Sequence, residues 1–330
     1  MNLAAIYEPI AEELASVEDF LASALGESDD PAISAISRFV LKSPGKRIRP
    51  ALVILSEKAA AGPGNSRCDR SRLIEIATAM ELIHMASLIH DDVLDEAVTR
   101  HNMPTVNIRY GKDISIVLGD YVYAKAFQLI GASGNSDIFA CMSEAIHAMC
   151  EGELLHVCQR RNLDMSKDSY IVIAQKKTAS LFAACCHAGA IIGGHGPALQ
   201  AALKEFGLNF GVAFQLIDDC RDVIREQADL GKCPGQDVLS GDVTLPILAL
   251  SKAVGRAQRQ EIQNMLGSAN DRKSLMKLRA MLADSNALAT TRQVVASYLD
   301  AAQKKLDILA DSVYKGSLGR LVDYIAQETF

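Results

Sequence analysis

Apolar residues recur at steps of three and four along most of the chain, which places them on one face of a helix. The first such stripe consists of Ile6, Ile10, Leu14, Val17 and Leu21. Longer stretches with the same spacing cover about 70–98, 113–131, 136–160, 166–193 and 198–228. No segment shows the sustained alternation of apolar and polar residues that predicts a strand. The pattern therefore predicts an all-α fold.

Capping and turn-forming residues divide this pattern into separate helices. Asp30-Pro31 predicts the start of a helix that runs through Leu41, because aspartate is a good N-cap and proline fits the first turn. A further helix is expected from Pro50 to the glycine-rich turn at 62–65.

Residues 231–246 (GKCPGQDVLSGDVTLP) are rich in turn formers and predict an ordered functional loop. Helices resume beyond it, with breaks expected at Gly316 and Gly319. The chain has 330 residues, and neither a linker nor an internal repeat divides it. We therefore expect one domain spanning residues 1–330.

Charge and cysteine content exclude several classes of protein. The net charge is −6, which disfavours nucleic-acid binding. No uninterrupted apolar run reaches the roughly 18–20 residues that cross a bilayer, and acidic residues stand where a signal peptide needs a basic start. The eight cysteines form no CxxC pair, so we expect reduced thiols and a cytoplasmic protein.

Two aspartate-rich clusters of the same form each follow an apolar helix. The first, DDVLD, contains Asp91, Asp92 and Asp95, and the second, DDCRD, contains Asp218, Asp219 and Asp222. Carboxylates four positions apart share a helix face and repel each other. A single cluster is commonly a solvated helix end. Two together favour a magnesium–diphosphate site, because Mg²⁺ prefers carboxylates combined with phosphate oxygens.

Basic residues that suit diphosphate oxygens accompany the clusters. The segment GKRIRP (45–50) carries three cations at a helix start, where free backbone N–H groups also attract anions. Arg100 follows the first cluster, Lys177-Thr178 interrupts an apolar helix, and Lys232 lies in the glycine-rich loop. Each residue alone fits an ordinary surface position, whereas the combination favours diphosphate binding.

Taken together, these segments resemble the trans-isoprenyl diphosphate synthases, and among them the polyprenyl branch with long, octaprenyl- or solanesyl-like products. The similar segments are GKRIRP, ELIHMASLIHDDVLDEAVTR, PTVN, VLGDYVYAKAFQL, KKTASLF, FQLIDDCRD, LGK and VTLP. They lie in the family's order between about residues 40 and 250. The resemblance implies the isoprenoid synthase fold, a single large helical bundle with a central cavity.

The resemblance also assigns roles to individual residues. It implies Mg²⁺ binding by Asp91, Asp95 and Asp218, with support from Asp92, Asp219 and Asp222. It implies contacts to the allylic diphosphate from Arg100, Lys177, Thr178, Gln215 and Lys232. It implies isopentenyl diphosphate binding by Lys46, Arg49, His84 and His101.

The implied reaction joins isopentenyl diphosphate to an allylic diphosphate head to tail (1′-4). Three Mg²⁺ ions per site and the neighbouring cations stabilise the departing diphosphate, and the second substrate's double bond attacks the allylic carbocation. The released diphosphate takes up the final proton, which agrees with the lack of an obvious general base. The resemblance further implies a homodimer.

Two positions depart from the family pattern. Arg100-His101-Asn102 stands where family members usually carry Arg-Arg-Gly, so His101 replaces an arginine. Ser240-Gly241-Asp242 stands where the family usually has Glu-Gly-Lys, so Asp242 replaces a lysine. We expect an active enzyme with weakened binding of isopentenyl diphosphate.

Small residues below the first cluster bear on product length. Ser87 and Ala86 lie one turn below Asp91, and Ile83 lies a further turn down. Family members that stop early carry bulky aromatic residues there. We therefore expect a product longer than farnesyl, although small residues would also suit close helix packing.

Three rival hypotheses remain. Glu81-x-x-His84 and Glu153-x-x-His156 match the paired motif of di-iron carboxylate bundles. The substitutions at 101 and 242 would also suit a catalytically weak regulatory subunit of a heteromeric prenyl synthase. A terpene cyclase shares one DDxxD cluster but has no need for GKRIRP.

Overall fold

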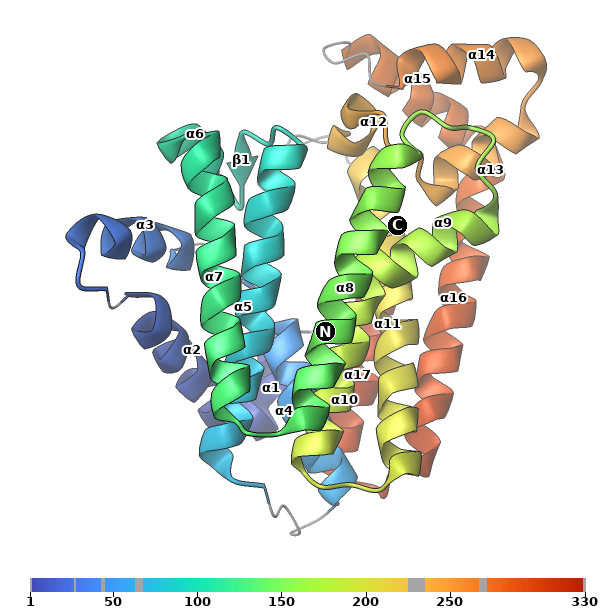
Figure 1. Ribbon diagram of the computed structural model, residues 1–330. Helices are drawn as coiled ribbons and strands as arrows, with labels where there is room; N and C mark the ends of the chain where they lie inside the picture. The colour runs from blue at the N-terminus through green and yellow to red at the C-terminus, as the bar shows by residue number, and fades with distance from the viewer. Residues whose placement is uncertain are drawn as a thin grey trace.

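Helices make up nearly all of the computed structural model, which describes residues 2–26, 28–42, 45–62, 68–224, 235–266 and 272–328. Long helices run roughly side by side through the molecule, and two short helices, α14 and α15, lie across one end (Figure 1). The predicted all-α fold is confirmed.

The first part of the chain leads into the central helix α4, which packs against α5 and α10. Its elements are α1 (Leu3–Tyr7), the 3₁₀ turn η1 (Glu8–Ile10), α2 (Ala11–Gly26), α3 (Pro31–Leu41) and α4 (Ile48–Ala61). The predicted cap of α3 is confirmed, because Asp30 accepts hydrogen bonds from the backbone N–H groups of Ala32 and Ile33. Helix α4 starts at Ile48, two residues before the proline that was expected to open it.

The middle of the chain supplies the helices that surround the bundle's centre. They are α5 (Arg70–Leu94), α6 (Val106–Tyr110), α7 (Lys112–Ala132), α8 (Ser136–Cys158), α9 (Lys167–Ala174), the π-helical turn η2 (Gln175–Ala179), α10 (Ser180–Ile192) and α11 (Pro197–Ile224). A short hairpin, β1 (Thr99–Arg100) with β2 (Met103–Pro104), follows α5. His101 and Asn102 both have positive φ at its tip, the conformation of a tight two-residue hairpin turn.

The last part of the chain closes one side and one end of the bundle. Its elements are α12 (Gln236–Ser240), α13 (Leu245–Ala253), α14 (Arg256–Met265), α15 (Arg272–Ala283), α16 (Ala287–Lys305), η3 (Leu306–Ile308) and α17 (Val313–Gln327). The breaks expected at Gly316 and Gly319 were wrong, because both residues lie inside α17. Side-chain packing of a helix face outweighs the modest helix penalty of glycine.

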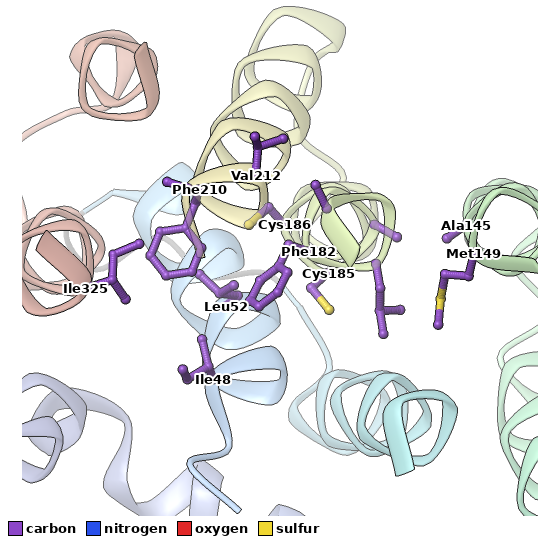
Figure 2. Packing of buried hydrophobic residues seen from close by; sticks show 14 of the residues in the cluster. Ile48, Leu52, Ala145, Met149, Phe182, Cys185, Cys186, Phe210, Val212 and Ile325 are labelled. Carbon is purple, nitrogen blue, oxygen red and sulfur yellow. The ribbon is translucent and has the colours of Figure 1, made fainter. Parts of the chain in front are cut away.

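The hydrophobic core lies where α4, α10 and α11 meet (Figure 2). Phe182 of α10 and Phe210 of α11 are fully buried, with ring centroids 5.5 Å apart. Cys185 and Cys186 are buried beside them, and every cysteine in the described ranges is a free thiol. The expected reduced state of the thiols therefore agrees with the structure.

Helix α5 combines considerable length with an apolar composition. By length and composition alone it is long and apolar enough to cross a membrane, although charged and polar residues interrupt its apolar positions. Within the fold, 72% of its most apolar 18-residue window is buried. Its hydropathy thus matches its place as a central helix packed on α4 and α7.

Candidate active site

A cavity of about 940 Å³ opens between the long helices, and both aspartate clusters line it. The first cluster lies at the end of α5, and the second lies in the last two turns of α11. Acidic groups are unfavourable at helix C-termini, because the last carbonyl groups carry partial negative charge. Each cluster therefore requires cations from elsewhere in the structure.

Arginines distant in sequence neutralise part of the first cluster. Asp92 accepts from Nε of Arg100 at 2.9 Å, and Asp95 lies 3.0 Å from Nη2 of Arg160. These two arginines balance the charges of Asp92 and Asp95 across the fold. Asp91 has no hydrogen bond or ion pair from its side chain to any described residue.

The environment of Asp91 favours a cation. Burial raises the pKa of its carboxyl to about 6, and the charge of Lys177 only partly opposes this rise. A divalent cation would restore the ionised form by supplying positive charge directly at the carboxylate.

The second cluster contains one exposed and one buried carboxylate. Asp218 is exposed to the cavity. Asp219 is buried and accepts hydrogen bonds from Tyr170 and from Gln215, the latter at 2.5 Å. Thr178 in turn donates to Gln215 at 2.5 Å. Burial raises the pKa of Asp219, although both donors oppose this rise.

These residues fit magnesium in kind and in number. The two clusters, one on α5 and one on α11, offer hard carboxylate oxygens to one cavity. In the described part of the chain, no group of three or more His, Cys, Asp or Glu side chains converges to hold an ion alone. Mg²⁺ matches such a site, because it commonly combines one or two carboxylates with water and substrate phosphate oxygens.

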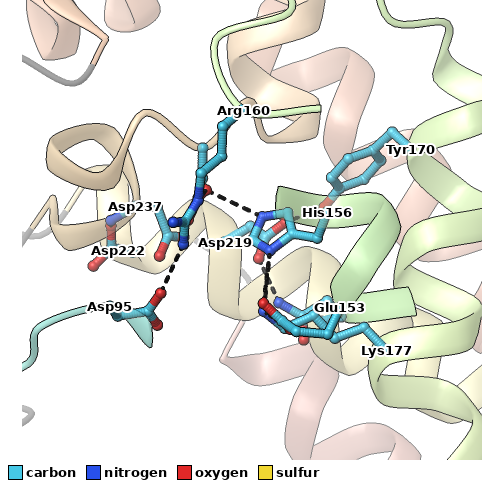
Figure 3. A network of polar contacts seen from close by, with 11 residues as sticks. Asp95, Glu153, His156, Arg160, Tyr170, Lys177, Asp219, Asp222 and Asp237 are labelled. Atoms are coloured by element: carbon cyan, nitrogen blue, oxygen red, sulfur yellow. Dashed lines mark hydrogen bonds and ion pairs between the residues drawn. The ribbon is translucent and has the colours of Figure 1, made fainter. Parts of the chain in front are cut away.

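Lys177 lies in the π-helical turn η2 and extends toward Glu153 and His156 of α8 (Figure 3). Its Nζ atom lies 2.6 Å from Oε2 of Glu153 and 3.1 Å from Nδ1 of His156. A Cβ atom on Gly152 would lie 2.3 Å from the backbone nitrogen of Lys177. Only glycine at that position permits α8 and the π turn to approach this closely.

The three basic residues of segment 45–50 all line the cavity but have different partners. Arg49 stacks on Phe182 at 4.5 Å, and its Nε atom has no hydrogen-bond partner among the described residues. Lys46 is exposed and lies over the ring of Tyr324. Arg47 instead pairs with Glu81 at 2.8 Å and with Glu18, so it fastens α4 to α5 and α2.

His84 and His101 line the same cavity. Burial, followed by the charges of Arg49 and Arg100, holds the pKa of His84 well below its usual value. His84 is therefore neutral and able to donate one hydrogen bond. His101 is exposed at the hairpin tip.

The residues proposed for chain length separate in the structure. Ser87 lines the cavity, whereas Ala86 and Ile83 are fully buried in the core and are absent from its wall. Ala86 and Ile83 therefore lie behind the wall of this cavity, and the role of all three residues in chain length stays a prediction. Lys232 lies outside the described residues.

Sequence reasoning missed several residues of this site. Glu153 and His156 appeared only as half of a di-iron motif, and Arg160, Tyr170 and Asp237 received no role. Glu81 pairs with Arg47 and Glu153 with Lys177, so arginine and lysine occupy the carboxylates that the di-iron hypothesis requires. The Glu-x-x-His spacing in α8 was the available signal.

Comparisons with known proteins identify the family of this chain. The sequence profile of the polyprenyl synthetase family matches residues 30–284. Octaprenyl diphosphate synthase of Escherichia coli (strain K12) is 32% identical over 318 residues, 96% of each chain. Heptaprenyl diphosphate synthase component 2 of Geobacillus stearothermophilus is 31% identical over 331 residues, 100% of each chain.

Solved structures show the same architecture. A polyprenyl synthase from Caulobacter crescentus CB15, complexed with calcium and isoprenyl diphosphate, superposes with a TM-score of 0.93 at 28% identity, covering 100% of this chain and 98% of that one. A decaprenyl diphosphate synthase from Rhodobacter capsulatus gives a TM-score of 0.90 at 28% identity, covering 100% of both chains. With this fold, this pair of aspartate clusters and the match over residues 30–284, the chain belongs to the polyprenyl synthetase family.

Proposed function

We propose that the protein condenses isopentenyl diphosphate with an allylic diphosphate, head to tail and with Mg²⁺, to give a trans-polyprenyl diphosphate longer than farnesyl. The observation that carries this proposal is the shared cavity. Both aspartate clusters line it, together with two separate groups of cationic residues. Membership of the family makes the chain a prenyltransferase.

Each half of the cavity suits one diphosphate. Asp91, Asp95 and Asp218 would hold Mg²⁺, with Asp92, Asp219 and Asp222 in support, and we propose three ions per site. Lys177, Thr178, Gln215 and Arg100 would contact the allylic diphosphate. Isopentenyl diphosphate would be held by Lys46, Arg49, His84 and His101. This assignment rests on Arg49, whose Nε has no hydrogen-bond partner among the described residues.

The chain's residues contribute to the reaction by binding, orientation and exclusion of water. Bound Mg²⁺ supplies positive charge that stabilises the departing diphosphate. Lys177 holds a second positive charge at the same place, fixed by Glu153 and His156. When the allylic C–O bond breaks, the electron pair of the isopentenyl double bond forms the new C–C bond. The released diphosphate accepts the proton that leaves, so no protein nucleophile is needed.

An apolar wall leads away from the first cluster. Ser87, Met85, Tyr123, Met149 and Leu181 contribute to it. Such a lining suits a growing isoprenoid tail, because the reactive cation and the tail are both kept from water. This supports a product longer than farnesyl.

We further propose a cytoplasmic homodimer in which residues 1–330 form one domain. Val117 of α7 and Phe139 of α8 are 66% and 49% exposed. Phe127 and Phe139 bridge the two helices, with ring centroids 6.5 Å apart. A second copy would cover this apolar surface. Light scattering of the wild type and of Val117→Asp would test the dimer by molar mass.

The decisive experiment uses the purified chain alone. It is incubated with labelled isopentenyl diphosphate, Mg²⁺ and a series of allylic primers, and the products are sized by chromatography. We expect elongation beyond farnesyl. No product from any primer would favour the regulatory-subunit hypothesis, in keeping with a relative that is named as one component of a synthase.

A further inference from the structure

Arg160 joins two carboxylates that belong to different parts of the site (Figure 3). It lies just beyond the end of α8. Its Nε atom donates to Oδ1 of Asp242 at 2.9 Å, and its Nη2 atom lies 3.0 Å from Oδ1 of Asp95. The planar guanidinium thus connects the C-cap of α5 to the segment that follows α12.

The segment 235–244 is attached to both acidic helices around this arginine. Gln236 donates to the backbone carbonyl of Asp95 at 3.1 Å, and the N–H of Asp237 donates to Asp222 at 3.1 Å. The N–H of Arg161 donates to the carbonyl of Gly241 at 2.7 Å. The segment therefore spans the opening between the first and second aspartate clusters.

The buried carboxylate of Asp242 destabilises the fold unless a positive charge lies beside it. Its side chain is only 5% exposed, and it lines the cavity into which both diphosphates must come. The guanidinium of Arg160 supplies the positive charge that balances this carboxylate. His156 lies 3.4 Å from the same carboxylate oxygen.

Arg160 is not among the residues that line the cavity, whereas Asp95 and Asp242 are. It therefore acts through these two carboxylates and not by touching substrate. Burial by itself would lower the pKa of Arg160. The charges of Asp242 and Asp95 outweigh this effect and raise the pKa above its usual value, as expected for a guanidinium held between two carboxylates.

We propose that Arg160 is a positioning residue, which neutralises Asp242 and fixes the carboxylate of Asp95 and the segment 235–244 in the arrangement that receives the magnesium-bound allylic diphosphate. The part that concerns substrate rests on the proposed function. The part that concerns the segment rests on the contacts alone. Arginine is required because its fork reaches two carboxylates at once, whereas lysine presents a single nitrogen.

The test compares Arg160→Gln, Arg160→Lys, Asp242→Asn and the double variant Arg160→Gln/Asp242→Asn. Lys112→Gln is the control, because it removes an exposed ion pair with Glu96 near the same end of α5. Circular dichroism and thermal melting establish that each variant is folded. Hydrogen exchange of residues 235–244 is measured without metal or substrate, and steady-state kinetics follow with each diphosphate varied in turn.

We expect Arg160→Gln to speed exchange in this segment and to raise KM for the allylic diphosphate about tenfold, the effect of one lost charge-assisted hydrogen bond. KM for isopentenyl diphosphate should change much less. Arg160→Lys should resemble Arg160→Gln. The double variant should recover part of the loss in KM, because the buried carboxylate of Asp242 is removed together with the arginine that balances it, whereas Asp95 still lacks its partner.

Three results would overturn the proposal: unchanged exchange in Arg160→Gln, full recovery by lysine, or strictly additive effects in the double variant. If the wild type is active and any of these three results is found, the proposed function stands and the role proposed for Arg160 is wrong. If the wild type is inactive but exchange in residues 235–244 still becomes faster in Arg160→Gln, the proposed function is wrong and the anchoring of the segment by Arg160 stands.

Discussion

The Nζ atom of Lys177 lies 2.6 Å from the Glu153 carboxylate, across the contact between the π-helical turn and α8. Burial disfavours the charged amine, but the charges of Asp91 and Glu153 raise the pKa of Lys177 above its usual value. Conversely, although burial opposes it, the hydrogen bond from His156 and the charge of Lys177 lower the pKa of Glu153 to about 2. Both groups therefore stay charged, and Lys177 is a fixed cation beside the first aspartate cluster.

Replacing Lys177 by methionine should reduce kcat about 100-fold, because one preorganised charge on the leaving diphosphate is lost. Lys176→Met is the matched control, since Lys176 pairs with Glu151 and does not line the cavity. Rates of single turnover for both variants would check this. Equal losses in the two variants would contradict the role given to Lys177.

Gly152→Ala should displace the π turn without altering any charged group. Its new Cβ would lie 2.3 Å from the nitrogen of Lys177 and 2.8 Å from the carbonyl carbon of Lys176. We expect a loss of about 1–3 kcal/mol in the free energy of unfolding, together with reduced activity. Gly131→Ala, with no atom within 4 Å of its new Cβ, should be neutral or stabilising in urea denaturation.

The elevated pKa of Asp91 makes metal binding depend on pH. The pKa of the Asp91 carboxyl is about 6 in the folded protein, against an ordinary value of 3.8. The folded, metal-free protein therefore binds this proton more tightly than the unfolded chain does, and it loses stability as the pH rises from about 3.8 to about 6. The loss amounts to at most about 3 kcal/mol. Mg²⁺ with diphosphate must displace the proton, so its stabilising effect should be larger at about pH 7.5 than at about pH 5.

Thermal melting with and without Mg²⁺ and diphosphate measures this difference. Asp91→Asn should lose most of the metal-dependent rise in Tm at both pH values. An equal rise at both pH values in the wild type would show that Asp91 does not exchange its proton for metal.

His101→Arg should lower the apparent KM for isopentenyl diphosphate. Histidine is mostly neutral at neutral pH, whereas arginine always carries charge and presents several donors. One added charge-assisted hydrogen bond corresponds to about a tenfold change. The backbone is already left-handed at this position with histidine, at φ 51°. An unchanged KM would remove His101 from the binding site.

Ser87→Phe should shorten the product, because its ring would enter the cavity one turn below Asp91. Ala86→Phe is the informative comparison. Ala86 is fully buried in the core, so a phenyl ring there should cost stability through overpacking instead of cutting the chain. Chromatography of the products, with thermal melting of both variants, separates the two effects. Products of unchanged length from Ser87→Phe would show that the tail does not follow this face.

The amino-acid sequence alone determined the elements and the chemical groups of this protein. Helix periodicity, the Asp30 cap and the i, i+4 spacing of each aspartate cluster are local properties, and all of them act within a few residues. The placement of GKRIRP at a helix start is local in the same sense. Both aspartate clusters and the first basic segment therefore appear where the sequence predicted them.

The tertiary structure decided which of these groups meet. Arg160 is 65 residues from Asp95 and 82 from Asp242 in sequence, so no local pattern links them. Ser87 reaches the cavity while its neighbour Ala86 is buried, because packing against other helices determines which face of α5 is enclosed. Asp242 looked from the sequence like a lost cation. In the fold it is the partner of an arginine, since a buried carboxylate must be balanced by a charge brought close in space.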